Sequence, residues 1–378
     1  MQRRSFLKNA TVGAAAATID APAIAQAGQI RWRLASSFPK SLDTIYGAAE
    51  VFAKNVSDAT GGKFTISTHP ANELVPAFGV VDAVQNATVE CAHTAPYYFF
   101  GKDESFAFDC AVPFGLNSRQ QTAWMFEGNG MKLMRDFYKQ YSIYNLPMGN
   151  TGAQMGGWYR KEIKSLADLK GMKMRIGGFG GKVLERIGGV PQNIPGGEIY
   201  PALEKGTIDA TEWVGPYDDE KLGFNKVAPN YYYPGWWEGG PQLSLYVNQK
   251  AWDALPADYK AIVTGAASHA HVVMQARYDA KNPDALKRLV AGGARLRPMP
   301  RPIMEAAFKA SQDLYSELSA KNQNWRRIYE DWSKFRADQV LWFRITEREF
   351  DNFMAAQRLD GTPSAAAKGA PAKKVAPQ

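Results

Sequence analysis

The chain has 378 residues, which at about 150 residues per domain predicts two or three domains and a large buried core. Apolar residues make up 45% of it and charged residues 22%, which excludes a mostly disordered, collagen-like or disulfide-stapled chain. The formal net charge is +8, but residues 1–27 carry +2 and residues 361–378 carry +3, so that only +3 remains on residues 28–360. This weak positive field argues against nucleic acid as a partner.

Residues 1–27 have the pattern of an export signal. Arg3 and Arg4 are followed by Phe6-Leu7-Lys8, an alanine-rich run and the A-x-A sequence at residues 25–27. This order predicts a twin-arginine signal peptide that is cleaved after Ala27. No later segment offers about 18 uninterrupted apolar residues, so we expect the mature chain to be soluble in a bacterial periplasm.

The two cysteines, Cys91 and Cys110, could form one disulfide bond in that compartment. They form neither a C-x-x-C nor a C-x-x-C-H motif. The usual signatures of haem attachment, iron–sulfur ligation and thioredoxin-type chemistry are therefore missing.

The first folded elements predict a β-α-β opening. Residues 30–35 read as a strand, residues 42–59 as a helix that ends at Gly61-Gly62, and residues 64–68 as a second strand. Further along, Ser165 to Asp168 resembles a capping box that starts a one-turn helix, which Gly171 ends. Apolar and basic residues then alternate over 172–176, which predicts the first strand of another strand-helix-strand run.

The two runs resemble one another in sequence. Residues 83–94 (AVQNATVECAHT) and residues 202–213 (ALEKGTIDATEW) place a helix end, a break and a strand at the same positions, with His93 where the second copy has Glu212. A repeated pattern of this kind predicts two similar α/β lobes with mainly parallel sheets and a ligand cleft between them. We assign lobe 1 to residues 28–150 and about 242–285, and lobe 2 to residues 151–241 and about 286–322.

After about residue 300 the pattern becomes almost continuously helical, from Pro302 to Gln357. Aromatic and aliphatic residues recur at spacings of three and four, so these long C-terminal helices must cover the lobes or a second subunit. Residues 359–378 are rich in alanine, proline and lysine and are expected to be disordered.

Arg175 is the first candidate for ligand chemistry. It lies on the polar side of a predicted strand, before the glycine-rich residues 177–181, and a helix is expected to begin near Lys182. A guanidinium beside a helix N-terminus suits a carboxylate ligand. The alternative is an ordinary exposed strand arginine. The glycine run fits neither a Walker A motif nor G-x-G-x-x-G, which argues against a nucleotide loop.

Glu212 and Gln154 are candidates for cation binding. Glu212 shares a strand face with Ile208 and Ala210, so its carboxylate is expected in apolar surroundings that require a cation nearby, either Arg175 or a metal ion. The amide oxygen of Gln154 suits sodium or calcium rather than zinc. The alternative for both is a structural role.

Other chemistry-bearing residues give weaker signals. The four histidines have no zinc-binding spacing. Aromatic runs are expected in the core or at a lobe interface, with a pocket wall as the alternative, and they occur at residues 97–100, 231–233 and 236–237.

Over residues 1–358 the sequence resembles the periplasmic solute-binding subunit of tripartite ATP-independent (TRAP) transporters, and within it the type that binds 2-oxoacids. The stretches that carry this resemblance are residues 32–39 (WRLASSFP), 149–152 (GNTG), 154–158 (QMGGW), 174–175 (MR) and 206–223 (GTIDATEWVGPYDDEKLG). The resemblance implies an α/β fold of the two-lobed periplasmic binding protein type, with long C-terminal helices. It also implies that the lobes close on a small organic anion and deliver it to a membrane permease.

The resemblance further implies roles for individual residues. Arg175 would grip the ligand carboxylate, and Tyr98 and Asn150 would hydrogen-bond the ligand. Gln154, the Glu212 side chain and the main-chain carbonyl of Trp213 would hold a sodium ion that also touches the oxoacid, and relatives that take lactate hold calcium in a similar way. A homodimer is implied as well, in which residues 323–358 form dimerisation helices that reach across to the partner.

Charge counting makes such a site reasonable. Arg175 and Na⁺ would neutralise Glu212 and a monocarboxylate, and a 2-oxo or 2-hydroxy oxygen would chelate the cation together with the carboxylate. A pyruvate-like acid is therefore favoured over a dicarboxylate, and calcium would leave one surplus positive charge unless another acid entered the site.

Two other functions stay open at this stage. One is a twin-arginine-exported enzyme that acts on a small carboxylic acid, although no cofactor motif supports it. The other is a structural or sensory partner protein, for which the aromatic helices are the only support. The identity of the acid, the choice between sodium and calcium, the pairing of the cysteines and the identity of the permease are also left open.

Overall fold

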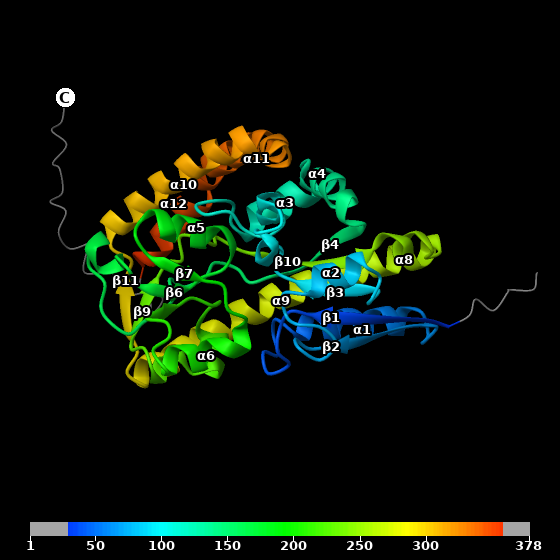
Figure 1. The fold of residues 1–378 in the computed structure, drawn as a ribbon, viewed down its shortest axis with the longest axis horizontal. Coiled ribbons are helices and arrows are strands. Elements are labelled where there is room, and N and C mark those ends of the chain that lie inside the picture. Colours follow the sequence, from blue (N-terminus) through cyan, green and yellow to red (C-terminus); the bar gives the residue numbers. More distant parts are fainter. Residues whose placement is uncertain (1–28, 358–378) are drawn as a thin grey trace, which may run out of the picture.

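The computed structural model describes residues 29–357, which form two sheets covered by helices (Figure 1). The first sheet has the strand order β2-β1-β3-β10-β4, with bounds β1 (Ile30–Ser36), β2 (Phe64–His69), β3 (Cys91–Thr94), β4 (Ile143–Asn150) and β10 (Gln242–Asn248). The second has the order β11-β9-β5-β8-β6-β7, with bounds β5 (Trp158–Tyr159), β6 (Lys173–Arg175), β7 (Val190–Gln192), β8 (Ala210–Thr211), β9 (Asn230–Tyr233) and β11 (Arg295–Pro298).

The helices surround these sheets. Their bounds are α1 (Gly47–Ala59), α2 (Val80–Gln85), α3 (Ser118–Phe126), α4 (Gly130–Tyr138), α5 (Gly178–Arg186), α6 (Gly196–Glu204), α7 (Pro216–Leu222), α8 (Gln249–Asp253), α9 (Ala257–Ala291), α10 (Arg301–Lys321), α11 (Gln323–Ile345) and α12 (Glu347–Ala355). Short 3-10 helices are η1 (Pro96–Phe99), η2 (Glu104–Asp109), η3 (Lys139–Tyr141), η4 (Leu166–Leu169) and η5 (Phe224–Lys226). Within residues 29–357, no helix is both long enough and apolar enough to cross a membrane.

The internal repeat predicted from the sequence is visible in the sheet topology. In the first lobe, the unit β1-α1-β2 is followed by β3, which pairs in parallel on the other side of β1. In the second lobe, β6-α5-β7 is followed by β8, which pairs in parallel on the other side of β6. The capping box at Ser165 and Asp168 also forms, ahead of the 3-10 helix η4.

Both sheets are mixed rather than mainly parallel, which differs from the prediction. In the first sheet, β10 runs antiparallel to both β3 and β4. In the second sheet, β5 runs antiparallel to both β8 and β9. The cause is that these strands enter from the segments that pass between the lobes, so they do not follow the local β-α-β connections that make neighbouring strands parallel.

The chain passes between the two sheets after β4, after β9 and along α9. Helix α9 is the longest of these connections: Tyr259 near its start stacks on Phe64 of β2, with ring centroids 5.8 Å apart. Near its other end, Arg288 forms an ion pair of 2.6 Å with Glu220 of α7. Figure 1 shows α9, in yellow, extending past both sheets. The residue limits assigned to each lobe from the sequence remain a prediction.

The C-terminal helical region is divided into three helices, not continuous as the sequence pattern suggested. Asn322 separates α10 from α11, and its side chain accepts a hydrogen bond from Trp325 N at 3.0 Å, which is an N-cap. One face of the first half of α11 is buried, at Trp325, Ile328 and Trp332. Trp325 contacts Phe108 of η2 and Phe179 of α5, with centroids 4.4 and 5.5 Å apart. These aromatic contacts attach α11 to both lobes.

Three other predictions concern the cysteines and the two ends of the chain. Cys91 and Cys110 are both buried and unpaired, so the optional disulfide bond is not formed. The predicted signal peptide, residues 1–27, and the predicted disordered tail, residues 359–378, lie outside the described residues.

Candidate functional site

Arg175 ends strand β6 and lies in the interior of the molecule. Its exposed fraction is 0%, so the alternative of an exposed strand arginine is wrong. Nε donates to the carbonyl of Ile194 at 3.0 Å, while Nη1 donates to the main-chain carbonyl of Glu212 at 3.2 Å and forms an ion pair with the Glu212 carboxylate. Nη2 has no partner among the described residues. One face of the guanidinium is therefore fixed, and a second donor is left over.

Glu212 follows strand β8 and is also fully buried. Its Oε1 accepts from Arg175 Nη1 and, at 2.9 Å, from the main-chain N–H of Gly177. Its Oε2 has no partner among the described residues. Burial raises the pKa of Glu212, and Arg175 together with the Gly177 N–H only partly offsets that rise. Burial by itself would lower the pKa of Arg175, but the charge of Glu212 acts together with Tyr98, Tyr97 and Glu238 to outweigh this effect, and the pKa is raised.

Gln154 and Trp213 adjoin this pair. Gln154 lies in the segment that crosses from β4 to β5; its Nε2 donates to Thr151 Oγ1 at 3.0 Å, and its Oε1 has no partner among the described residues. The Trp213 indole packs against Arg175, whose guanidinium carbon lies 4.9 Å from the ring centroid. Two of the predicted cation ligands, Gln154 Oε1 and Glu212 Oε2, are thus buried acceptors to which no described residue donates.

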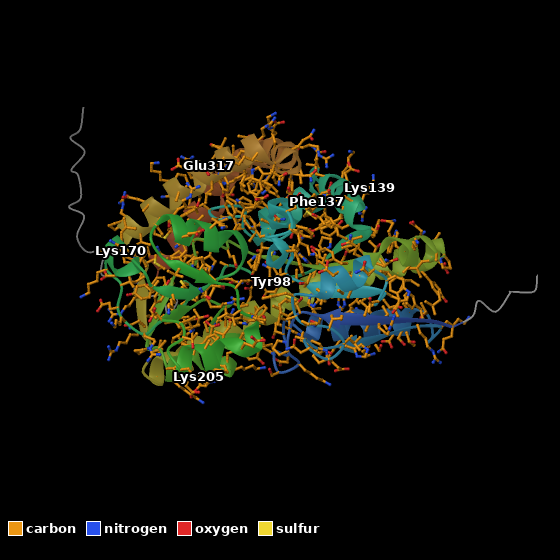
Figure 2. All side chains as sticks on the ribbon, in the orientation of Figure 1. Tyr98, Phe137, Lys139, Lys170, Lys205 and Glu317 are labelled. Carbon is orange, nitrogen blue, oxygen red and sulfur yellow. The ribbon has the colours of Figure 1, made fainter. Side chains whose placement is uncertain are left out.

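The 3-10 helix η1 of the first lobe brings Tyr97 and Tyr98 to the second lobe. Figure 2 shows Tyr98 near the middle of the molecule, between the elements of the two sheets. Tyr98 is 8% exposed and lies beside Arg175, whose positive charge opposes the rise that burial causes in the pKa of this tyrosine. Arg175, Glu212, Gln154, Trp213 and Tyr98 therefore lie together at one place, while their roles in ligand and cation binding stay predictions.

Asn150 is positioned differently from the other candidates. Its Oδ1 accepts from Gly152 N at 2.8 Å, and its Nδ2 donates to the Gly240 carbonyl at 3.0 Å. It therefore joins the two segments that cross between the lobes. One amide hydrogen and one lone pair of Oδ1 remain for a ligand, and the predicted ligand contact of Asn150 stays a prediction.

The glycine run after Arg175 serves a purpose that the sequence did not indicate. Helix α5 begins at Gly178, not near Lys182 as predicted. A Cβ at Gly177 or Gly178 would come within 2.6 Å of the Tyr97 side chain, and Gly178 has a φ of 52°. The space that these glycines leave is therefore filled by an aromatic side chain from the other lobe.

Further contacts between the lobes show that the cleft is closed. Phe100 packs against Phe179, with centroids 5.3 Å apart. Asp43, from the segment before α1, accepts a hydrogen bond of 3.0 Å from Tyr217 and forms an ion pair with Lys221, both on α7. The cavity left beside Tyr98, Gln154 and Trp213 is about 10 Å³, the space of one water molecule. An organic acid can therefore enter only if the cleft opens or these side chains move.

Glu238 is a buried acid at this site that the sequence analysis missed. It lies in the segment between β9 and β10, is 3% exposed, and its Oε2 has no partner among the described residues. Burial raises its pKa well above the ordinary value, and the negative charge of Glu212 raises it further, while Arg175 and a hydrogen bond with Tyr97 act in the opposite direction. The available signal was a single acid between Trp236-Trp237 and Gly239-Gly240, a stretch otherwise without charge.

Other metal chemistry has less support in the structure. Among residues 29–357, no group of three or more His, Cys, Asp or Glu side chains is arranged to hold a metal ion. His93, which occupies the position of Glu212 in the sequence repeat, is fully buried, and this burial lowers its pKa to about 3. A cation at the candidate site would thus depend on carboxylate, amide and carbonyl oxygens together, a donor set that suits sodium or calcium.

Two α/β lobes that close on a small buried charged site are the architecture of a periplasmic solute-binding protein. Residues 35–322 match the family described as bacterial extracellular solute-binding protein, family 7 (DctP). The chain belongs to this family, the solute-binding proteins of TRAP transporters.

Known relatives extend this similarity over most of the chain. The monocarboxylate 2-oxoacid-binding periplasmic protein of Nostoc sp. is 48% identical over 365 residues, which cover 95% of this chain and 100% of the relative. A TRAP solute-binding protein from Bordetella bronchiseptica is similar in structure, with a TM-score of 0.86, 54% identity and coverage of 87% of this chain and 98% of that one. It is described as a mixed-occupancy dimer with copurified calcium and picolinate in one active site and an apo site.

A second solved structure is a TRAP periplasmic solute-binding protein from Pseudoalteromonas atlantica, with bound sodium and pyruvate. It has a TM-score of 0.82 and 40% identity, and the match covers 86% of this chain and 99% of that one. The two-lobed fold inferred from the resemblance is therefore confirmed.

Proposed function

We propose that this TRAP solute-binding protein captures a small 2-oxo or 2-hydroxy monocarboxylate, such as pyruvate, together with a sodium or calcium ion. The observation that carries the proposal is a set of unpartnered polar atoms of opposite character at one buried place. Within residues 29–357, Arg175 Nη2 is a donor without an acceptor, and Glu212 Oε2 and Gln154 Oε1 are acceptors without donors. Buried polar atoms are seldom left in this state unless something else satisfies them.

The free donor suits the carboxylate of the acid. Arg175 is held by Ile194 and Glu212 on one side, so its Nη2 needs no reorientation to meet an oxygen. A charge-assisted hydrogen bond from a buried guanidinium is among the stronger contacts that a protein can offer a carboxylate. The Tyr98 phenol, which lies beside Arg175, supplies a further donor to the same ligand.

The free acceptors suit a cation. Glu212 Oε2, Gln154 Oε1 and the main-chain carbonyl of Trp213 would hold it, and all three are the hard oxygen ligands that sodium and calcium prefer. The ion would supply positive charge to the ligand oxygens and offset the buried carboxylate of Glu212. The protein residues provide the orientation, since Gln154 is fixed by Thr151 and Glu212 by Gly177.

Glu238 changes the charge count made from the sequence. If Glu238 is neutral, Arg175 and Na⁺ balance Glu212 and a monocarboxylate. If Glu238 is ionised, the same balance requires Ca²⁺. The surplus charge that the sequence argument assigned to calcium is therefore removed by this second acid, whose Oε2 is buried and has no partner in the described part of the chain. Both cations can thus give a neutral closed site.

The class of acid follows from chelation. Pyruvate, bound with sodium in the Pseudoalteromonas atlantica protein, has an oxygen on the carbon next to its carboxylate. Picolinate, bound with calcium in the Bordetella bronchiseptica protein, has a ring nitrogen in the equivalent position. Either ligand can chelate a cation in a five-membered ring, which a plain aliphatic acid cannot do. These ligands support a 2-oxo or 2-hydroxy acid for this chain.

The remaining parts of the proposal come from the family. A TRAP solute-binding protein works with membrane permease subunits, so delivery to such a permease is the proposed task, and binding without turnover is favoured over the exported enzyme. The periplasm is the proposed location, with the twin-arginine pattern of residues 1–27 as the export signal.

A calorimetric titration tests ligand and cation together. Dialysed protein should bind pyruvate at micromolar or tighter concentrations when sodium or calcium is present, and at least about tenfold more weakly after the cation is removed with a chelator and exchanged for a bulky organic cation. Propionate is the matched control, because it has the size of pyruvate but no 2-oxygen. Equal affinity for pyruvate and propionate would contradict chelation, and pyruvate turnover would favour the enzyme.

We also propose a homodimer built through the C-terminal helices, as the Bordetella bronchiseptica protein is described as a dimer. The ends of α11 and α12 carry apolar side chains that are more than half exposed: Leu341, Trp342, Ile345, Phe350 and Phe353. Beside them, a groove of about 690 Å³ lies between α3, α9 and α11, and Phe126 and Val272 in it are exposed as well. A cluster of exposed apolar side chains beside a groove is typical of a subunit interface.

The double substitution Ile345→Glu and Phe353→Glu should convert the dimer into a monomer, because each introduces a charge into the apolar contact. Sedimentation velocity at micromolar protein measures the mass. Val190→Glu, which changes an exposed apolar residue of β7, should leave the mass of the dimer unchanged. A wild-type protein that is already monomeric at these concentrations would refute the proposed dimer.

A further inference from the structure

Two adjacent buried aspartates of α7 have the same kind of partners. Asp218 Oδ2 accepts from the indole N–H of Trp213 at 3.3 Å and from the phenol of Tyr278 at 2.7 Å. Asp219 Oδ2 accepts from the indole N–H of Trp158 at 2.9 Å and from the phenol of Tyr231 at 2.7 Å. Each aspartate thus joins one tryptophan to one tyrosine, and both are at most 1% exposed.

The two aspartates join different parts of the molecule. Trp158 and Tyr231 are paired residues of β5 and β9, and their rings stack with centroids 3.8 Å apart. Asp219 therefore joins two neighbouring strands of the second sheet to one another. Asp218 instead joins Trp213, which lies at the candidate ligand site, to Tyr278 on α9, the helix that extends past both sheets (Figure 1).

The position of the Trp213 indole matters to the site. The indole packs against the Arg175 guanidinium, whose central carbon lies 4.9 Å from the centroid of the Trp213 ring. On another side it meets Gly196 at the start of α6, where any side chain would come within 2.5 Å of the ring. Because the ring is confined in this way, a shift of its N–H end displaces both the guanidinium and the Trp213 main chain.

Helix α9 contacts both lobes, so its position depends on how the lobes are arranged. It packs on α1 and β4 of the first lobe and on α7 of the second. Asn282, one turn beyond Tyr278, accepts a hydrogen bond of 3.0 Å from Tyr217 N at the start of α7. Tyr278 thus lies on α9 at the place where the helix meets α7, and its phenol is held by the same oxygen of Asp218 that accepts from Trp213.

We propose that Asp218 is a positioning residue that ties the Trp213 side of the ligand site to helix α9, so that the closed arrangement of the lobes and the ligand-binding geometry depend on one another. The inference rests on the proposed function, since it assigns Trp213 to the site. Asp218 itself need not touch the ligand. Its two donors converge on one oxygen, so releasing Tyr278 changes the position at which Trp213 is held.

A pair of matched substitutions, each of which removes one hydroxyl group, tests the proposal. Tyr278→Phe and Tyr231→Phe each remove a phenol that donates at 2.7 Å to a buried aspartate, so both should lower the melting temperature by a similar amount. Only Tyr278→Phe should weaken pyruvate binding in the presence of calcium, by about three- to tenfold, whereas Tyr231→Phe should keep the wild-type affinity. Equal affinities of the two variants would overturn the proposal.

A spectroscopic measurement separates this inference from the proposed function, because it needs no ligand. In ¹⁵N-labelled protein, the indole N–H resonance of Trp213, assigned by its loss in Trp213→Phe, should shift in Tyr278→Phe and stay in place in Tyr231→Phe. If wild-type protein fails to bind pyruvate, the proposed function fails, and this resonance still tests the link. An unmoved resonance in Tyr278→Phe would refute it.

Variants of Asp218 cover the case in which Tyr278→Phe does not fold. Asp218→Asn keeps an acceptor oxygen for both donors and should bind pyruvate within about threefold of wild type. Asp218→Ala removes the acceptor and should bind about tenfold more weakly. If the alanine variant binds as well as the asparagine variant, Asp218 has no positioning role.

Discussion

Replacing Arg175 with alanine should weaken pyruvate binding by about 2–5 kcal/mol in saturating calcium. The reason is that Arg175 is the positively charged side chain that compensates the buried carboxylate of Glu212. Glu238 also lies close enough to raise the pKa of Arg175. Without it, an acid that enters the cleft meets uncompensated negative charge. Isothermal titration calorimetry measures the change, with pyruvate titrated into the variant and into the wild type under identical conditions.

The alanine variant also loses a buried ion pair, which by itself costs about 3–5 kcal/mol of folding stability. Arg175→Lys is therefore the necessary companion, because it keeps the positive charge beside Glu212. Lysine cannot reproduce the separate contacts of Nε, Nη1 and Nη2, so this variant should fold and still bind about tenfold more weakly or worse. Wild-type affinity in a folded Arg175→Lys or Arg175→Ala protein would remove Arg175 from the site.

Glu212→Gln should weaken binding of the cation, and with it the effect of a given cation concentration on pyruvate binding. Glutamine keeps the size of the side chain and one oxygen, but it removes the full charge that would attract the ion. We expect the cation concentration needed for half-maximal pyruvate binding to rise at least about tenfold, which a calcium titration at fixed pyruvate measures. The control is Glu305→Gln, which removes a carboxylate from an exposed ion pair with Arg301 within α10 and should change nothing.

Glu238→Gln distinguishes the role of Glu238 from that of Glu212 in the response to each cation. According to the charge count, it removes the second carboxylate that calcium requires, so calcium should lose its effect while sodium keeps it. The same titration, carried out with each cation in turn, measures the difference. If Glu212→Gln needs no more cation than wild type, or Glu238→Gln responds to both cations as wild type does, the proposed roles of these acids are wrong.

Much of the fold could be predicted because its determinants are local in the sequence. The β-α-β openings, the capping box at Ser165 and the repeat that aligns His93 with Glu212 each depend on residues close together in the chain. The antiparallel placement of β5 and β10 depends on how segments cross between the lobes, and no local pattern specifies that path. For the same reason, the division of the C-terminal region at Asn322 was obscured by its regular aromatic spacing.

The candidate site shows the same division between local and long-range information. Arg175 and Glu212 stand out because each combines a charge with a strand end, a feature that short stretches of sequence reveal. The contact of Tyr97 with Gly177 and Gly178 joins residues of different lobes, so the glycine run could be mistaken for a ligand-binding loop. Glu238 enters the site from the second crossing segment, and its burial depends on packing that the sequence does not display.

A crystal structure of the calcium- and pyruvate-loaded protein, with the ion located by its anomalous scattering, tests the central claim most directly. The account predicts the pyruvate carboxylate on Arg175, and calcium bound by Gln154, Glu212 and the carbonyl of Trp213 while also touching the 2-oxygen. Pyruvate bound outside the cleft, or a loaded cleft with no ion between these three residues, would contradict it.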